Sequence, residues 1–263
     1  MGRNLESSRA IGRGWDEMSV DYQSSSEIST SDIHYSPFGP GEAELGLIGE
    51  ISGKDILELG CGAAQNCIAA DRQGANRVVG VDISSKQLEA ALSIRNKTKS
   101  SIEVIQGDLE DLHFLKEATF DIVLSMFAAE FLYDIRRFFY TCNKLLKKGG
   151  VLILSTVHPL AAFEWDSDME TLLVKNYLNP PVERWGNESN PDEGKATTFF
   201  RTIEEISNTM LDSGFEIKGL YEPGVLPETE IRKSPYKGPY WQPFFKRFEK
   251  TPFALVIKAK KIG

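Results

Sequence analysis

Acidic residues at the ends of predicted strands, together with one glycine-rich turn, are the part of this sequence best suited to chemistry. The segment DILELGCGAAQN (55–66) combines a strand that ends in Glu58 with a turn that contains Gly60 and Gly62. Glycines at a strand-to-helix turn let a ligand approach the backbone, and the N-terminus of the next helix offers free N–H groups. The segment therefore predicts a site for a nucleotide-type ligand.

Two classes of nucleotide-type ligand compete for this turn. A dinucleotide fingerprint, G-x-G-x-x-G, would place Gln65 where its third glycine belongs. The pattern acid-x-G-x-G-x-G would place Ala64 there instead, a smaller departure provided that φ stays negative at this residue. The acid before the glycines also suits a positively charged ligand better than a pyrophosphate. The turn alone therefore favours the second pattern without settling the choice.

Two further acids follow the next two predicted strands. RVVGVD (77–82) ends in Asp82, where a carboxylate can accept hydrogen bonds from both hydroxyls of a ribose. Asp108 follows SIEVIQ (101–106), in reach of an adenine amino group. Any one of these acids could simply cap a helix or solvate a strand end. Acids at three successive strand ends, beside a glycine-rich turn, favour a shared ligand site and count against the dinucleotide reading.

The elements that must position these residues alternate between strand and helix after residue 50. Such an order predicts a doubly wound α/β fold, with a mainly parallel sheet and helices on both faces. A capping box at Thr202 with Glu205 marks the helix that precedes the two closing strands. The expected strands are 54–59, 77–82, 101–106, 120–127, 151–157, 215–221 and 253–260, and the expected helices are 63–74, 86–97, 134–148 and 203–214.

Three regions interrupt this alternation, and all three are expected to project from the strand ends where ligands bind. We predict a single domain over residues 1–263, in which 51–157 form the ligand-binding core. Residues 1–50 are expected to form a helical flap, and its serine-rich part, 23–33, a mobile loop. Residues 158–200 and 223–252 are proline- and aromatic-rich insertions. Their aromatic side chains could line a pocket for a flat or apolar acceptor, or fill a small core of their own.

Composition and charge indicate the cellular compartment and the class of binding partner. The sequence has no apolar run long enough to span a bilayer and no signal peptide, and its three cysteines are read as reduced thiols in a cytoplasmic protein. The net charge of −8 disfavours a nucleic-acid partner. The segment 231–263 has the opposite balance, with nine Lys and Arg against one acid. We interpret this segment as a solvated rim rather than a nucleic-acid surface.

The ordered motifs ELGCGAAQN, VVGVDISSKQLEAA, QGDLEDL, FDIVLSMFAAEFL and LLKKGGVLILSTVHP resemble the class I S-adenosylmethionine (SAM)-dependent methyltransferases, in their small-molecule branch. The resemblance covers about residues 50–160. It implies a seven-stranded sheet whose last strand is antiparallel, with SAM as cofactor and S-adenosylhomocysteine as product. The cofactor-binding residues that it implies are Tyr22, Glu58, Gly60, Gly62, Asp82, Ile83, Gln87, Asp108, Leu109 and Ser125.

In this family the two glycines pack on the methionine part of SAM, Asp82 takes the ribose hydroxyls, and Asp108 and Leu109 hold the adenine beside Ile83. Ser125 would lie under the methionine end, and Tyr22 would close the site. These roles are carried over from the resemblance.

The reaction expected of such a protein is in-line transfer of the sulfonium methyl group to a small molecule. His158, at the end of the fifth predicted strand, is the candidate general base; equally, it could only hydrogen-bond the entry of the insertion. No bound metal is expected. Two alternatives stay open, a SAM-binding protein without methyl transfer and an RNA or protein methyltransferase. The acceptor and the oligomeric state are not indicated.

Overall fold

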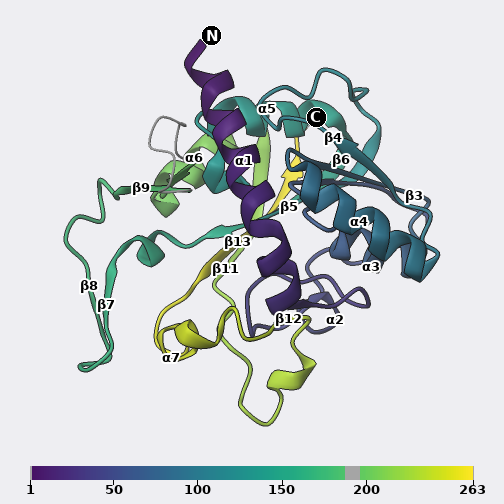
Figure 1. Ribbon diagram of the computed structural model, residues 1–263. Coiled ribbons are helices and arrows are strands. Elements are labelled where there is room, and N and C mark those ends of the chain that lie inside the picture. Colours follow the sequence, from purple (N-terminus) through teal and green to yellow (C-terminus); the bar gives the residue numbers. More distant parts are fainter. Residues whose placement is uncertain (1, 187–195, 263) are drawn as a thin grey trace.

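A seven-stranded sheet forms the centre of the computed structural model, which describes residues 2–186 and 196–262 (Figure 1). The strand order is β11-β13-β6-β5-β2-β3-β4. The strands from β6 to β4 are parallel, whereas β13 is antiparallel to both of its neighbours. The expected fold class is therefore confirmed. The strands are β2 (Asp55–Leu59), β3 (Arg77–Asp82), β4 (Glu103–Gln106), β5 (Phe120–Met126), β6 (Leu146–Val157), β11 (Phe215–Tyr221) and β13 (Ala254–Lys261).

Helices cover both faces of this sheet, as a doubly wound fold requires. One hydrophobic cluster joins the sheet to α5 (Ile135–Leu145) and α6 (Ile203–Asp212). A second cluster, on the other face, joins it to α3 (Gln65–Arg72) and α4 (Ser85–Thr98). Within the described residues, no helix combines the length and the apolar character that crossing a membrane requires.

Side-chain caps fix where these helices begin. The Ser84 hydroxyl accepts a hydrogen bond from the Gln87 N–H at the start of α4, and Thr202 accepts one from Glu205 at the start of α6. At the end of α5 the expectation was wrong, because the helix stops at Leu145 rather than at 148. Leu146 already pairs with Phe120 in the sheet, so β6 begins before the two glycines.

The N-terminal segment forms the expected helix, α1 (Gly2–Ser25), which runs past the sheet in Figure 1. The short strand β1 (Glu27–Ile28) follows it and pairs with β12 (Tyr236–Lys237). A one-turn helix, α2 (Glu42–Leu45), then leads toward β2. The serine-rich segment 23–33 is thus tied at β1 to a part of the chain more than 200 residues away.

The insertion 158–200 contains regular structure that its sequence pattern did not indicate. Two short antiparallel ribbons form there, and Figure 1 shows the first of them extending away from the sheet. Residues 187–195 of the insertion lie outside the described residues. The helix α7 (Phe245–Phe248) belongs to the other insertion, 223–252. The ribbons consist of β7 (Glu164–Asp166) with β8 (Thr171–Leu173), and β9 (Val182–Trp185) with β10 (Ala196–Phe199).

Candidate active site

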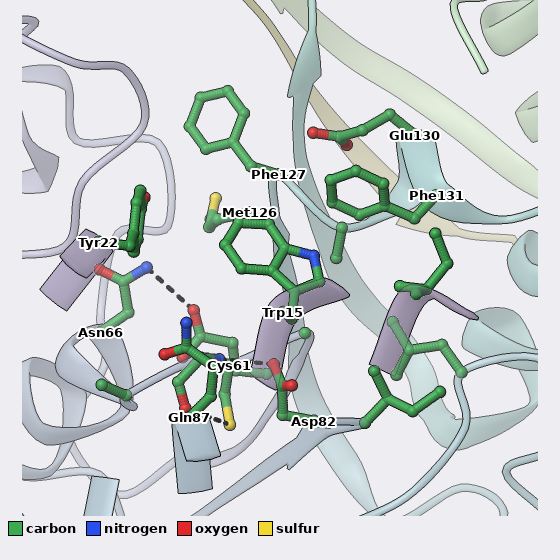
Figure 2. Close-up of a pocket in the computed structure, with 18 of the residues that line it drawn as sticks. Trp15, Tyr22, Cys61, Asn66, Asp82, Gln87, Met126, Phe127, Glu130 and Phe131 are labelled. Atoms are coloured by element: carbon green, nitrogen blue, oxygen red, sulfur yellow. Dashed lines mark hydrogen bonds between the residues drawn. The ribbon is translucent and has the colours of Figure 1, made fainter. Parts of the chain in front are cut away.

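A cavity lies at the carboxyl ends of the central strands (Figure 2), and residues of α1 line one side of it. Its empty volume is about 1310 Å³, open solvent at the mouth included. Nine of the ten expected cofactor residues line this cavity: Tyr22, Glu58, Gly60, Gly62, Asp82, Ile83, Gln87, Asp108 and Leu109.

Ser125 is the expected cofactor residue that is absent from the cavity lining. It is fully buried in β5, and its hydroxyl has no hydrogen-bond partner among the described residues. The next residue, Met126, does line the cavity, because successive side chains of a strand point to opposite faces. Ser125 therefore lies behind the cavity wall.

The turn between β2 and α3 brings backbone, rather than side chains, to the cavity. Gly60 has φ +78°, and a Cβ placed there would overlap the methyl group of Ala128. Gly62 also has a positive φ of +52°. Ala64 departs from the expectation, because its φ is +60° rather than negative. This buried alanine adopts a left-handed conformation that costs a non-glycine residue about 1–2 kcal/mol.

The Asp82 carboxylate joins two segments at the floor of the cavity. One oxygen accepts the Gly62 N–H at 2.8 Å, and the other accepts the Ser84 N–H at 2.8 Å. Burial raises the pKa of Asp82 above its usual value, whereas the two N–H donors act in the opposite direction. Each oxygen accepts one such bond, which leaves a further lone pair for the hydroxyl of a ligand.

Glu58 is held at the end of β2 by two side chains of α3. Its carboxylate accepts hydrogen bonds from the Asn66 amide at 2.9 Å and from the Cys67 thiol at 3.0 Å. Burial raises the pKa of Glu58 to about 7. A cationic ligand beside this carboxylate would lower its pKa again and would be stabilised by it.

Polar contacts fix α1 across the mouth of the cavity at two points. The Asp16 carboxylate accepts a hydrogen bond from the Ser84 hydroxyl at 2.6 Å. About two turns later, the Gln23 amide bridges two residues of the site. It donates to Gln87 at 2.8 Å and accepts from Gln65 at 2.7 Å. Helix α1, the roof of the cavity, is thus connected to α3 and α4, the two helices whose N-termini surround it.

Aromatic rings form the remaining wall beneath α1. Figure 2 shows Trp15 in the middle of the cavity, and its ring meets those of Tyr22 and Phe131 edge-to-face at 5.6 and 5.7 Å. Tyr22 in turn packs against Tyr240 at 5.0 Å and hydrogen-bonds the hydroxyl of Tyr236. This wall is apolar, in contrast to the acidic floor.

Glu130 is a cavity residue whose role the sequence did not reveal. It lies on the one-turn 3₁₀ helix Ala129–Phe131 after β5 and is 3% exposed. The Thr156 hydroxyl donates to it at 3.1 Å, and burial raises its pKa to about 7. The available signal was a charged residue inside the apolar run SMFAAEFL.

His158 does not line the cavity, although it follows β6. Its Nε2 is 2.7 Å from a carboxylate oxygen of Glu222, and its Nδ1 accepts the Leu160 N–H at 3.1 Å. Both ring nitrogens are therefore engaged within the protein, in line with the second of the two roles considered for it. Burial lowers the pKa of His158 below its usual value.

His34 does line the cavity, and its Nδ1 is buried without a hydrogen-bond partner among the described residues. Burial lowers its pKa to about 4, so its imidazole is neutral at pH 7. Over residues 2–186 and 196–262, no three His, Cys, Asp or Glu side chains are grouped so that they could hold a metal ion.

Comparison with known proteins settles the family. Residues 57–154 match the family described as a methyltransferase domain. The structure also resembles the crystal structure of a SAM-dependent methyltransferase from Mesorhizobium loti, with a TM-score of 0.66 and 26% identity over 83% of this chain and 96% of that one. The chain belongs to the class I SAM-dependent methyltransferases. The cofactor of this methyltransferase is SAM, and its product from the cofactor is S-adenosylhomocysteine.

Two relatives of known acceptor are similar to parts of the methyltransferase. A ubiquinone biosynthesis O-methyltransferase of Bradyrhizobium is 31% identical over 62% of this chain and 58% of that enzyme. A ribosomal protein L11 methyltransferase of Thermosipho africanus is 36% identical over 51% of this chain and 45% of that enzyme. The matches span less than two thirds of either relative. Since their names give one small-molecule pathway and one protein acceptor, relatedness alone does not select the acceptor.

Proposed function

We propose that this methyltransferase transfers the methyl group of SAM to a small molecule enclosed beneath α1. The observation that carries this proposal is the roof over the cavity, which is tethered through Asp16 and Gln23. A protein side chain or a nucleotide within a polymer would have to enter past this roof, whereas a small molecule fits beneath it. The resemblance to a ubiquinone biosynthesis O-methyltransferase supports the same acceptor class.

The charges of the C-terminal insertion also support a small molecule rather than a nucleic acid. Lys233 pairs with Glu230 at 2.9 Å. Lys246 and Lys250 lie 3.7 and 3.5 Å from the carboxylate of Glu170. Basic residues that already face carboxylates are a poor match for a phosphate backbone, which is bound by uncompensated positive charge. We accordingly propose that this segment is a rim of the catalytic domain.

The residues of the floor fit SAM, and we propose the following arrangement. Gly60 and Gly62 admit the methionine part, because the absence of Cβ atoms leaves the backbone open. Asp82 has lone pairs left for the ribose hydroxyls. The acids Glu58, Asp82 and Asp108 also place negative charge around a cofactor that carries a sulfonium. Ile83 and Leu109 would enclose the adenine, and Gln87 and Tyr22 would close the site.

Catalysis in this arrangement depends mainly on positioning. When bound, SAM supplies a methyl group that is already activated for displacement. The chain's own residues have to hold the acceptor atom in line, about 3 Å from that methyl group, and keep water away. Trp15, Tyr22 and Phe131 provide an apolar wall for this purpose. We further propose that residues 1–263 act as one domain in the cytoplasm, a setting consistent with three cysteines that are buried and free.

The decisive experiment is incubation of the protein with methyl-labelled SAM and three separate fractions of a cell extract: metabolites, protein and RNA. Label in the metabolite fraction is expected, together with release of S-adenosylhomocysteine. Label confined to the protein or RNA fraction would contradict the small-molecule acceptor. Calorimetric binding of SAM without label in any fraction would favour a SAM-binding protein that transfers no methyl group.

A further inference from the structure

The charges that line the cavity are all of one sign. Five acids line it: Glu58, Asp82, Asp108, Glu110 and Glu130. None of the described lining residues is Lys or Arg, and the lining histidine is neutral at pH 7. No Lys or Arg side chain of the lining could pair with an anionic acceptor, and the five carboxyl groups would disfavour it. The cavity therefore selects for uncharged or cationic acceptors.

Four of these acids have other tasks. Glu58, Asp82 and Asp108 surround the proposed cofactor position. Glu110 accepts the Tyr133 N–H at 2.7 Å and so closes the loop after β4 against the 3₁₀ helix that follows β5. Glu130 is the remaining carboxylate, and it belongs to the aromatic end of the cavity, as Figure 2 shows with Phe131, Phe127 and Trp15 around the same space.

The position of Glu130 is fixed from two sides. Thr156 of β6 donates a hydrogen bond to its Oε2. The turn that carries it is held by Arg201, a buried residue ahead of α6. The guanidinium of Arg201 donates to the backbone carbonyls of Ala129, Leu132 and Tyr133 on either side of Glu130. A carboxylate held in this way, on a wall of aromatic rings, is arranged to meet one polar group of an otherwise apolar ligand.

We propose that Glu130 binds the O–H or N–H group of the acceptor and takes its proton during methyl transfer, and that the acceptor is an uncharged or cationic molecule with an apolar body. This proposal rests on the proposed function. The O–H or N–H bond breaks, and the proton goes to the Glu130 carboxylate. The electron pair left on oxygen or nitrogen forms the new bond to the methyl carbon. The carbon–sulfur bond breaks, and its pair stays on sulfur as the thioether of S-adenosylhomocysteine.

The environment of Glu130 suits a base that works near neutral pH. Burial raises its pKa to about 7, close to the optimum for a general base. The groups that face it are Thr156 from β6, whose hydrogen bond lowers this pKa, Arg201, whose charge lowers it too, and Tyr22 from α1. His34, with its pKa lowered to about 4, is a much weaker base for the same task.

Binding of four probes of similar shape tests the acceptor class without knowledge of the natural acceptor. These probes are toluene, p-cresol, 4-methylbenzylamine and p-toluate, titrated into the complex with S-adenosylhomocysteine and followed by calorimetry. We expect p-cresol or 4-methylbenzylamine to bind about tenfold or more tightly than toluene and p-toluate, the range for a hydrogen bond to a charged group. A preference for the phenol indicates an oxygen acceptor, and a preference for the amine indicates a nitrogen acceptor.

Variants assign this preference to Glu130. Glu130→Ala should abolish the advantage over toluene, whereas Glu204→Gln, at an exposed site on α6, should preserve it. Equal binding of the probes, absence of binding, or an unchanged preference in Glu130→Ala would overturn the inference. Methylation of a metabolite in the labelled-SAM experiment would still stand in that case, so failure of this inference is distinguishable from failure of the proposed function.

Turnover of the acceptor found in that experiment tests proton transfer. The rate should fall as pH drops below about 7, because Glu130 must be ionised to accept a proton. Glu130→Gln should remove this acidic limb of the pH–rate profile and lower turnover about 10²- to 10⁴-fold. Thr156→Val should keep the limb but move it to higher pH, since the Thr156 hydrogen bond lowers the pKa of Glu130. Near-normal turnover with an unchanged limb in Glu130→Gln would exclude Glu130 as the base.

Discussion

The Asp16 carboxylate of α1 lies 2.6 Å from the Ser84 hydroxyl at the start of α4, 68 residues further along the chain. It also accepts the Lys86 N–H at 3.0 Å, so it serves as a second cap for that helix. Asp82 holds the same loop from the other side through the Ser84 N–H. The roof of the cavity and its proposed ribose site are therefore joined through one short segment, 82–86.

Because of this connection, Asp16→Ala should weaken SAM binding. Loss of the cap frees α1 and leaves donors of α4 without their acceptor, and we expect a loss of about 1–2 kcal/mol in binding free energy by calorimetry. Hydrogen exchange over residues 15–35 should slow when SAM is added to the wild type, and less so in the variant. Glu17→Ala, at an exposed site one residue away, is the matched control. Equal affinity and equal protection in Asp16→Ala would remove α1 from cofactor binding.

Asp82→Ala should affect both cofactor affinity and folding. SAM affinity is expected to fall by about 1.5–3 kcal/mol, because a charged hydrogen-bond acceptor is lost. The free energy of unfolding should fall by about 1–3 kcal/mol as well, because the N–H groups of Gly62 and Ser84 lose their acceptor. Calorimetry and urea denaturation measure the two effects. Normal SAM binding in a folded variant would show that Asp82 only ends its strand.

The pH dependence of the unfolding free energy should reveal the raised pKa values of Glu58 and Glu130. Both have a folded-state pKa raised to about 7 from the usual value of 4.5. The folded state therefore binds more protons than the unfolded state between these values, and stability falls as pH rises from 4.5 to 7. For each group the loss is on the order of 3 kcal/mol.

The buried histidines act in the opposite direction, because lowered histidine pKa values add stability as pH rises toward 6.5. The comparison that isolates Glu130 is thus the difference between wild type and Glu130→Gln. We expect the unfolding free energy of the wild type, measured by urea denaturation at several pH values, to fall relative to that of Glu130→Gln between pH 4.5 and 7. Above pH 7 the difference should stay constant. A difference that does not vary with pH would mean that the Glu130 carboxyl is not shifted.

His158→Ala should lower stability without removing catalysis. Its ring nitrogens contact Glu222 and the Leu160 N–H, so the variant loses two hydrogen bonds that fix the entry to the insertion. We expect about 1–3 kcal/mol lower unfolding free energy and, for the folded fraction, turnover within a few-fold of the wild type. A loss of 10² or more in turnover with intact stability would instead establish His158 as the base.

The parts of the site that the sequence could predict are those formed by neighbouring residues. Glu58, Gly60 and Gly62 lie at one turn. Asp82 ends β3 and Asp108 follows β4, so the order of the parallel strands brings these acids together. Ala64 shows where this reasoning stops. Its residue type suggested a negative φ, but Ala64 is the N-cap of α3 and has φ +60°.

The parts that could not be predicted depend on contacts between distant segments. Glu130 lies on a single 3₁₀ turn, and its buried position depends on Arg201 and Thr156, which no local pattern connects to it. The ribbons of the insertion are similar, because β9 and β10 are stabilised by pairing with each other rather than by any strong pattern within either one. His158 was placed correctly at a strand end, yet its direction was set by Glu222, 64 residues later.

The contact between Tyr22 and Tyr236 affects the order in which the site can form while the chain is being synthesised. The two residues are 214 positions apart, and β1 likewise meets β12. The helix that covers the cavity is synthesised more than 200 residues before these partners. A nascent chain can form the contacts of Asp16 and Gln23 with the floor of the cavity early, whereas the contact of Tyr22 and the pairing of β1 require residues 236 and 237.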